Sequence, residues 1–337
     1  MGRSQASGPK ILLYGAGSIG GVYTYQLLQA GCQVTAVCRS NFTAVKELGF
    51  RLKSVRFGDV QYRPTNVVRN ISECATETFD YIVVCTKSFP GSNPSLPEQL
   101  APVLQGRTHT AVVLAQNGIS IEEEVANVYP ENPILSGVVY CPATQTGPGI
   151  IEYSEMLSCL ELGTYPAKAP ASHKAAAAQF VELMIIGGGG AEHHDNIQIA
   201  RWSKLLMNVA WNPTCALTLA TDGDFLLSSD PYAHELAWSV MMEVVELAQA
   251  MDIPEVTEEV AKQKFSITKK RAETGTGRMM SMGQDVEQGR RFEVEAILGN
   301  AVRLGRQKGV SMPRLDTLYA LTKARLQSLE REQALRS

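Results

Sequence analysis

Residues Lys10–Val22 read KILLYGAGSIGGV, and this stretch decides the fold of the first half of the chain. Four apolar or aromatic residues run directly into glycines at positions 15, 17 and 20, and an apolar helical pattern follows. The order predicts a buried parallel strand, a tight turn and a helix, which together form a dinucleotide-binding unit. An ordinary turn between a strand and a helix is the alternative, and the strand–turn–helix context favours the cofactor site.

Each glycine has its own task in such a unit. Gly15 is expected to make the tight turn, Gly17 to let the backbone approach a pyrophosphate, and Gly20 to let the helix pack on the strand. Free backbone N–H groups at the start of the helix would then hold the phosphates. The predicted cofactor-binding loop therefore consists of Gly15, Ala16, Gly17, Ser18, Ile19 and Gly20.

The end of the second predicted strand, Gln33–Cys38, indicates which dinucleotide binds. An NAD site carries Asp or Glu there, which accepts a hydrogen bond from the ribose 2′-hydroxyl. Here Arg39 and Ser40 follow the strand, and the next acidic residue is Glu47. Because a guanidinium can pair with the 2′-phosphate instead, we predict NADP as the cofactor. A solvated arginine at a strand end is the alternative.

Two further strands are expected to end beside the glycine loop. Asp80–Cys85 and Thr110–Ala115 read as buried strands, and Lys87 and Asn117 follow them. Because ligands bind at the carboxyl ends of parallel strands, both residues are predicted to belong to the site. Taken singly, a solvated lysine and a turn asparagine would be the ordinary interpretations.

Beyond Asp195 the strand pattern gives way to helical periodicity, so we expect a domain boundary there. The prediction is a disordered tail over residues 1–9, an NADP-binding Rossmann domain over residues 10–195 and a helical substrate domain over residues 196–337. The predicted fold class is thus α/β, with a Rossmann-type N-terminal domain followed by an all-helical C-terminal domain. We expect the site to lie between these two domains.

A polar stripe marks the first helix of the second half. Lys204, Asn208 and Asn212 are spaced four residues apart among apolar neighbours, so they lie on one face of a helix. Asparagine is a poor helix former, which favours a buried or cleft-lining row over a solvent-facing stripe. A partly desolvated lysine holds its proton less tightly, so Lys204 could act as a general acid. Pro213 is expected to end or kink this helix.

The composition excludes several classes of function. The 337 residues have a net charge of -3 without a basic block, and no apolar run reaches the length of a membrane span, which argues against nucleic-acid and membrane partners. Seven cysteines without a CxxC pair, and an N-terminus without an apolar signal core, indicate a cytoplasmic protein. We expect no metal, since the adjacent His193 and His194 would point to opposite faces of a strand.

Together these motifs resemble those of the ketopantoate reductase (2-dehydropantoate 2-reductase) family over nearly the whole chain. GAGSIGG resembles the family's cofactor loop, and the arginine after the second strand matches its 2′-phosphate ligand. CTKS and QNG carry its lysine and asparagine, KLLMNVAWNP its lysine and two asparagines, and SMGQD with FEVE its serine and glutamate. The residues matched in this way are Arg39, Lys87, Asn117, Lys204, Asn208, Asn212, Ser281 and Glu293.

The resemblance implies NADPH-dependent reduction of 2-dehydropantoate to pantoate, a step of pantothenate biosynthesis. It also implies that Lys204 is the general acid for the carbonyl oxygen, and that Glu293 accepts a hydrogen bond from a substrate hydroxyl and orients Lys204. Lys87 would lie where the cofactor and the substrate meet. The substrate-binding residues so implied are Asn117, Asn208, Asn212 and Ser281, and Asn117 would also contact the cofactor.

Two other functions stay open. One is a paralogous NADPH-dependent reductase that acts on another branched 2-keto acid with the same chemistry. The other is a non-catalytic NADP-binding sensor on the same fold, because a fold does not fix a function. The intact Lys204 and Glu293 count against the sensor. The expected partner is a small 2-keto acid, and the protein is expected to be a monomer or a homodimer.

Overall fold

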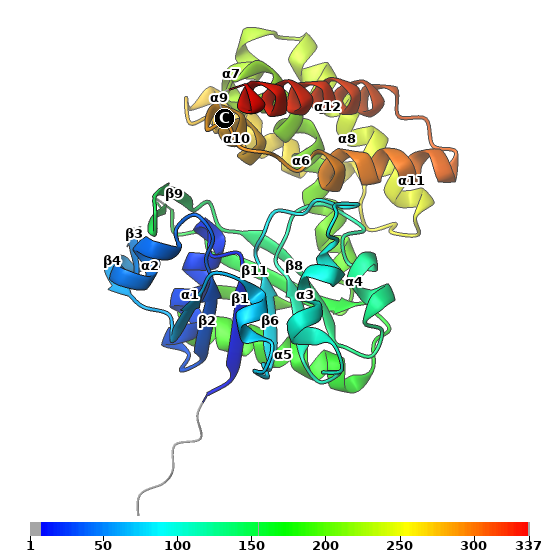
Figure 1. Cartoon of the computed structure of the whole chain (residues 1–337). Coiled ribbons are helices and arrows are strands. Elements are labelled where there is room, and N and C mark those ends of the chain that lie inside the picture. The colour runs from blue at the N-terminus through cyan, green and yellow to red at the C-terminus, as the bar shows by residue number, and fades with distance from the viewer. Residues whose placement is uncertain (1–7, 154, 336–337) are drawn as a thin grey trace, which may run out of the picture. The chain divides into compact units, whose positions relative to one another are not determined.

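The computed structural model describes residues 8–153 and 155–335, and its elements form two compact units (Figure 1). The sheet unit comprises residues 8–87, 91–116 and 122–197. The helical unit comprises residues 198–335 together with two short loop segments, Ser88–Pro90 and Asn117–Ile121. The tail expected over residues 1–9 lies largely outside the described residues.

The sheet unit is built on an eight-stranded sheet. All neighbouring strands pair in parallel except β8 and β11, which are antiparallel. The strands predicted at Gln33–Cys38, Asp80–Cys85 and Thr110–Ala115 are confirmed as β2, β6 and β7. In spatial order the sheet contains β12 (Gly190–His193), β11 (Cys159–Tyr165), β8 (Ile134–Tyr140), β7 (Ala111–Leu114), β6 (Tyr81–Val84), β1 (Lys10–Tyr14), β2 (Gln33–Val37) and β5 (Asn66–Val68).

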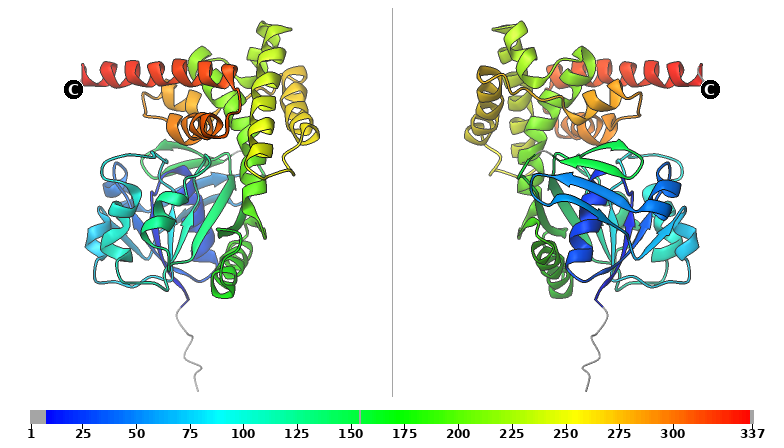
Figure 2. Two further views of the ribbon diagram at one scale, coloured as in Figure 1. Left: turned by 90° about the vertical axis from the view of Figure 1, so that its right-hand side faces the viewer. Right: turned by 90° about the vertical axis from the view of Figure 1, so that its left-hand side faces the viewer.

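Helices cover both faces of this sheet, as the two views of Figure 2 show. Both faces of the central strands are therefore apolar, and Ile11, Leu12 and Leu13 have no exposed surface. The long helices α1 and α5 pack against each other. The helical segments of the sheet unit are α1 (Ser18–Gln29), α2 (Phe42–Leu48), η1 (Ile71–Cys74), α3 (Leu96–Leu104), α4 (Glu123–Val128) and α5 (Ala171–Ile186).

A second sheet of four strands packs beside α1, and the sequence analysis did not predict it. A Cβ at Gly21 in α1 would clash with Ile151 of this sheet, so the missing side chain lets helix and sheet approach. The Tyr62 hydroxyl donates a hydrogen bond of 2.6 Å to the Gly21 carbonyl. In spatial order the strands are β4 (Gly58–Tyr62), β3 (Phe50–Ser54), β10 (Ile150–Tyr153) and β9 (Thr144–Gly147).

The part of the helical unit that the structure describes contains no strand, so the predicted fold class is confirmed. Its core joins apolar side chains from most of its helices, among them Trp211, Val244, Phe265 and Ile297. Of the described helices, none is both long and apolar enough to cross a bilayer. The elements are α6 (Ile197–Thr218), α7 (Asp222–Ser228), α8 (Tyr232–Ala250), α9 (Glu258–Glu273), α10 (Ser281–Glu287), the π-helical turn η2 (Glu295–Gly299), α11 (Asn300–Lys308) and α12 (Pro313–Ala334).

Of the two expectations for Pro213, that it ends its helix is wrong, because α6 continues to Thr218. A kink at Pro213 stays a prediction. Proline lacks an N–H, so one carbonyl a turn earlier loses its backbone donor. The Thr214 hydroxyl donates to the carbonyl of Ala210, one residue further along. Apolar residues on both sides of Pro213, such as Trp211 and Ala216, are fully buried. Their packing outweighs the loss of one backbone hydrogen bond.

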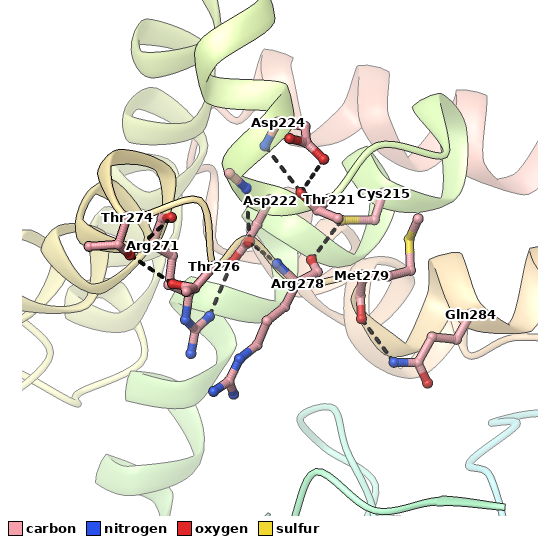
Figure 3. Close-up of polar contacts among 11 residues, drawn as sticks. Cys215, Thr221, Asp222, Asp224, Arg271, Thr274, Thr276, Arg278, Met279 and Gln284 are labelled. Atoms are coloured by element: carbon pink, nitrogen blue, oxygen red, sulfur yellow. Dashed lines mark hydrogen bonds and ion pairs between the residues drawn. The ribbon is translucent and has the colours of Figure 1, made fainter. Parts of the chain in front are cut away.

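Asp222 joins the start of α7 to the glycine-rich loop before α10, as Figure 3 shows. Its side chain has no exposed surface. Oδ1 accepts hydrogen bonds from the backbone N–H groups of Gly223 at 2.8 Å and Arg278 at 2.6 Å. Oδ2 pairs with the guanidinium of Arg271 at 3.1 Å. The buried carboxylate thus fixes the loop that leads into Ser281, the first residue of α10.

Replacing Asp222 with Ala should lower the free energy of unfolding of the helical unit by about 3–5 kcal/mol, because a buried pair loses its anion. Asp222→Asn should cost less, since its remaining Oδ1 can still accept the two backbone N–H groups. All three tryptophans, at 202, 211 and 238, lie in the helical unit, so urea unfolding followed by tryptophan fluorescence measures this quantity. The control is Asp224→Ala, which removes an exposed partner of Thr221. Equal losses for the Ala variants of Asp222 and Asp224 would contradict the assignment.

Candidate functional site

The glycine loop after β1 has the geometry that its sequence predicts. Gly15 has a φ of +103°, and a Cβ there would lie 2.5 Å from the backbone nitrogen of Thr86. A Cβ at Gly20 would clash with the carbonyl oxygen of Gly15. Both positions therefore require glycine, the first for its turn and for the approach of the next strand, the second for the packing of α1 on that turn.

The start of α1 has room for a phosphate. Gly17 is its N-cap residue, and none of the described side chains caps it. A Cβ at Gly17 would meet only Gln145 Oε1, at 3.9 Å. The first turn, which contains Ser18 and Ile19, has no acidic residue, so the positive end of the helix is not neutralised there. This open cradle fits the pyrophosphate of a dinucleotide.

Asn41 holds the glycine loop in place, a role that the sequence analysis did not predict. Its side chain is only 5% exposed, and Nδ2 donates a hydrogen bond of 2.7 Å to the Ala16 carbonyl. The loop conformation thus depends on a residue from the segment after β2. An asparagine close to a strand end also suits a turn, and the sequence alone does not separate these two roles.

Arg39 lies at the carboxyl end of β2, where it is exposed and held by an aromatic residue of the neighbouring strand. Its Nη2 donates to the hydroxyl of Tyr14 at 2.9 Å, and its Cζ lies 5.8 Å from the centre of that ring. The Tyr14 hydroxyl in turn donates to Gln99 Oε1 at 2.6 Å. The guanidinium is therefore oriented beside the glycine loop before any ligand binds.

Lys87 is half-buried and follows β6, three residues after the last residue of that strand. The loops after β6 and β7 are joined at this edge, because Gln116 Nε2 donates to the Thr86 carbonyl at 2.8 Å. The sheet thus brings together the ends of two strands that the sequence analysis expected to meet.

In the helical unit, Lys204 contacts Asn117. Lys204 Nζ donates a hydrogen bond of 2.9 Å to Asn117 Oδ1, and both side chains are half-buried. These residues are 87 positions apart in the sequence. The structure therefore joins the loop after β7 with the polar stripe of α6, two of the motifs that the sequence analysis singled out.

The segment Asn117–Ile121 is held on the π-helical turn η2. Gly118 has a φ of +99°, and a Cβ there would clash with the backbone of Ala296. The Ala296 carbonyl accepts a hydrogen bond of 3.2 Å from the N–H of Ile119. Asn300 Nδ2 donates to the Ile119 carbonyl at 2.7 Å. A π-helical turn departs from regular α-helical bonding and is frequent at functional sites, and here one of its carbonyls meets an outside donor.

Arg201 also binds this segment, and the sequence analysis missed it. It is 3% exposed, and its Nη1 donates to the Gly118 carbonyl at 2.8 Å. It lies three residues before Lys204 in α6, so both are on the same helix face. That spacing was a signal in the sequence, since it extends the polar stripe by one turn.

Glu293 lies just before the helix that contains η2 and is 8% exposed. Its Oε1 accepts a hydrogen bond of 2.8 Å from the backbone N–H of Ser88, in the other loop segment of the helical unit.

Asn212 joins α6 to the start of α10, and it is 3% exposed. Its Oδ1 accepts from Ser281 Oγ at 3.0 Å and from the Met282 N–H at 3.1 Å.

Asn212 also donates to Asn208 Oδ1 at 3.2 Å. The structure thus connects Asn208, Asn212 and Ser281 in one chain of hydrogen bonds. That they bind the substrate stays a prediction. The Asn212 oxygen is engaged by protein donors at the start of α10, so this side chain orients Ser281. The half-buried Asn208 is the more accessible of the two asparagines.

Of the adjacent His193 and His194, only His194 belongs to a cluster of possible metal ligands in the described residues, where it faces two carboxylates. Its Nε2 lies 3.9 Å from Glu161 Oε2 and 3.8 Å from Glu192 Oε2. These three ligand atoms all lie within 4.8 Å of one another. Glu161 and Glu192 are directly paired on neighbouring strands. That the protein binds no metal stays a prediction.

Comparisons with known proteins agree with the motifs. The model of the family described as ketopantoate reductase PanE/ApbA matches residues 11–167, and the model of its C-terminal domain matches residues 196–326. A crystal structure of 2-dehydropantoate 2-reductase from Methylococcus capsulatus is 33% identical, with a TM-score of 0.80, over 95% of this chain and 97% of the other.

Two other proteins are similar to this chain over most of its length. An uncharacterised Saccharomyces cerevisiae protein is 29% identical over 93% of this chain and 92% of its own length. The ternary structure of D-mandelate dehydrogenase with NADH and anilino(oxo)acetate has a TM-score of 0.81 at 24% identity, over 95% of this chain and 99% of the other. At that identity the second likeness shows the fold alone.

Gly118→Ala should lower the free energy of unfolding of the helical unit by about 3 kcal/mol, because backbone strain and the clash with Ala296 both act. Gly309→Ala is the matched control: its φ of +70° also disfavours a side chain, but nothing lies within 4 Å of the added Cβ. That variant should cost about 1 kcal/mol. Urea unfolding followed by tryptophan fluorescence compares the two. A control that costs as much as Gly118→Ala would show that the Ala296 contact is not the cause.

Proposed function

This chain belongs to the ketopantoate reductase family of oxidoreductases, and we propose that it reduces 2-dehydropantoate to pantoate with NADPH as the cofactor. The reaction would serve pantothenate biosynthesis in the cytoplasm, and the enzyme would be a monomer or a homodimer without a metal. The observation that carries the proposal is the 2.9 Å hydrogen bond between Lys204 Nζ and Asn117 Oδ1, in the unit that also contains the buried Glu293.

The proposed general acid is Lys204. When bound, the nicotinamide supplies the hydride for C2 of the keto acid. Reduction of a ketone develops negative charge on its oxygen, and the ammonium of Lys204 would stabilise that charge and then donate the proton. An ammonium has several N–H donors, so a hydrogen bond to Asn117 is compatible with another to a substrate oxygen. Asn117 thereby orients the ammonium.

Glu293 and the asparagine chain would position the substrate. A carboxylate accepts several hydrogen bonds, so Glu293 can hold the Ser88 N–H and accept from a substrate hydroxyl as well. Asn208 would donate to a polar group of the keto acid, and Ser281, whose hydroxyl proton goes to Asn212, would accept through its oxygen. Polar groups placed in this way supply orientation at little entropic cost.

The cofactor proposal rests on the residue after β2. Arg39, with no acid beside it, suits the 2′-phosphate of NADPH, and Gly15–Gly20 with the start of α1 suits the pyrophosphate. Lys87 and Asn117 would contact the nicotinamide half. The D-mandelate dehydrogenase named above was solved with NADH, so the choice between the two cofactors needs its own test.

A reductase of another branched 2-keto acid is the alternative. It would use Lys204 in the same way, because the 2-keto group on which Lys204 acts is common to all such substrates, whereas the contact with Glu293 would need a substrate hydroxyl. A non-catalytic NADP-binding sensor would bind the cofactor without turnover. Oxidation of NADPH across a panel of branched 2-keto acids separates the three, and the proposal requires 2-dehydropantoate to give the highest kcat/KM.

Lys204→Ala should lower kcat by roughly 10²–10⁴-fold, the usual effect of removing a general acid. The NADPH dissociation constant should stay unchanged, because the glycine loop and Arg39 belong to the other unit. Lys204→Arg should not restore the rate, since a guanidinium does not readily release its proton. Lys262→Ala, an exposed lysine of the helical unit, is the control and should behave as wild type.

Steady-state kinetics across pH measure these effects, and the alkaline limb of the kcat profile should disappear in Lys204→Ala. A lysine that only anchors the substrate carboxylate would instead raise KM and allow partial rescue by arginine. Turnover by Lys204→Arg near the wild-type rate would refute the role as general acid.

Arg39→Ala should weaken NADPH binding by roughly 10- to 100-fold and leave NADH binding nearly unchanged, as expected for a charge-assisted contact to the 2′-phosphate. Tyr14→Phe, which keeps the guanidinium but removes its hydrogen-bond acceptor, should cause a smaller loss of the same kind. Fluorescence titration with each cofactor gives the dissociation constants. If both cofactors weaken equally in Arg39→Ala, the residue does not recognise the 2′-phosphate.

A further inference from the structure

A 2′-phosphate carries about -1.5 to -2 charges near neutral pH, judged from ordinary phosphate esters. One guanidinium cannot neutralise that charge. This inference rests on the proposed cofactor, and it concerns which second cation of this chain completes the phosphate site. The adenosine ribose of a dinucleotide lies at the carboxyl end of β2 in this type of fold.

The end of β5 borders this place. β5 is the outer neighbour of β2, and the two strands pair in parallel with Val37 opposite Val68. The Cys38 N–H donates to the Val68 carbonyl at 2.9 Å. Because neighbouring strands lie about 4.8 Å apart, Arg69 begins close to Arg39 and at the same edge. Both side chains are exposed.

Phe42 connects the two arginines. Its N–H donates to the Arg39 carbonyl at 3.2 Å, so a single turn joins its ring to the end of β2. The Cζ atom of Arg69 lies 4.3 Å from the centre of the Phe42 ring. Stacking of this kind supports the guanidinium through one face and leaves the donors at its edge for other partners. Lys46 Nζ, 5.2 Å from the same ring, adds a further positive charge.

No described residue accepts a hydrogen bond from the Arg69 guanidinium. The nearest acid in the sequence, Glu73, is engaged elsewhere: its Oε1 accepts the backbone N–H groups of Arg69 at 3.0 Å and Asn70 at 2.8 Å. The guanidinium of Arg39 is also held in place, because it donates a hydrogen bond of 2.9 Å to the Tyr14 hydroxyl. Each arginine is thus supported by an aromatic residue, and no described carboxylate pairs with either guanidinium.

We propose that Arg69, stacked on Phe42, is a second ligand of the NADPH 2′-phosphate and shares with Arg39 the discrimination against NADH. The two guanidiniums would hold the phosphate together, Arg39 from the segment after β2 and Arg69 from the segment after β5. Planar guanidiniums bind phosphate oxygens in pairs of hydrogen bonds, so two of them can satisfy a dianion that one cannot.

The test is fluorescence titration of the full-length protein with NADPH and NADH. Arg69→Met keeps the apolar stem over Phe42 and removes the charge, and it should weaken NADPH by roughly 10-fold or more while changing NADH by less than about twofold. The double variant Arg39→Met/Arg69→Met should bind the two cofactors alike. Arg51→Met is the control: this exposed arginine of the same unit pairs with Asp59 at 2.8 Å and should leave both constants unchanged.

The outcomes separate this inference from the proposed function. A wild-type protein that binds NADPH no more tightly than NADH overturns the proposed cofactor and this inference with it. A wild-type preference for NADPH that Arg69→Met leaves intact overturns this inference alone. Loss of the preference in Arg69→Met, with NADH binding retained, supports it. Because Arg69 is exposed, the variant should fold normally, and unchanged NADH binding confirms that it does.

Discussion

The close contact between Gly118 and the backbone of Ala296 is the constraint on which the candidate site depends. It lets the loop after β7 lie directly on the π-helical turn, where the Ala296 carbonyl receives the Ile119 N–H. Arg201 and Asn300 then bind the two carbonyls of the same loop. Only with the backbone fixed in this way does Asn117 Oδ1 reach Lys204 Nζ at 2.9 Å. A larger residue at position 118 would remove the contact that orients the proposed general acid.

The helical unit uses the same physical solution twice. Two buried charged side chains bind backbone groups beside glycines: Arg201 of α6 binds the loop after β7, and Asp222 at the start of α7 binds the loop before α10. Burial of a charge is costly unless hydrogen bonds compensate it, and backbone groups of a loop provide that compensation. The result is that the loop with Asn117 and the loop that leads into Ser281 are each held by a buried charged side chain. The polar groups of the site can therefore be preorganised, including those that lie in or next to loops.

In the sheet unit, side chains close to the glycine loop hold the groups proposed to bind the cofactor. Asn41 holds the glycine loop, Tyr14 holds Arg39, and Phe42 supports Arg69. Asn41 and Phe42 lie at the start of α2, in the segment after β2, and Tyr14 ends the neighbouring strand β1. The positions next to the glycine loop thus serve to orient the groups that we propose to meet the phosphates, and the strand order places β5 beside them.

By itself the sequence determined the features that depend on neighbouring residues along the chain. The glycine loop, the alternation of strands and helices, the polar stripe of α6 and the residue after β2 follow from spacing and conformational preference. The tertiary structure decided which of these meet: Asn117 with Lys204, Glu293 with Ser88, and Asn212 with Ser281. The tertiary structure also keeps α6 helical beyond Pro213, although proline disfavours a helix interior, because the residues around it are buried. The β3–β4 hairpin went unpredicted, and the partners of Arg201, Asn41 and Asp222 lie in other segments. Contacts between distant segments depend on packing and burial, which no local pattern encodes.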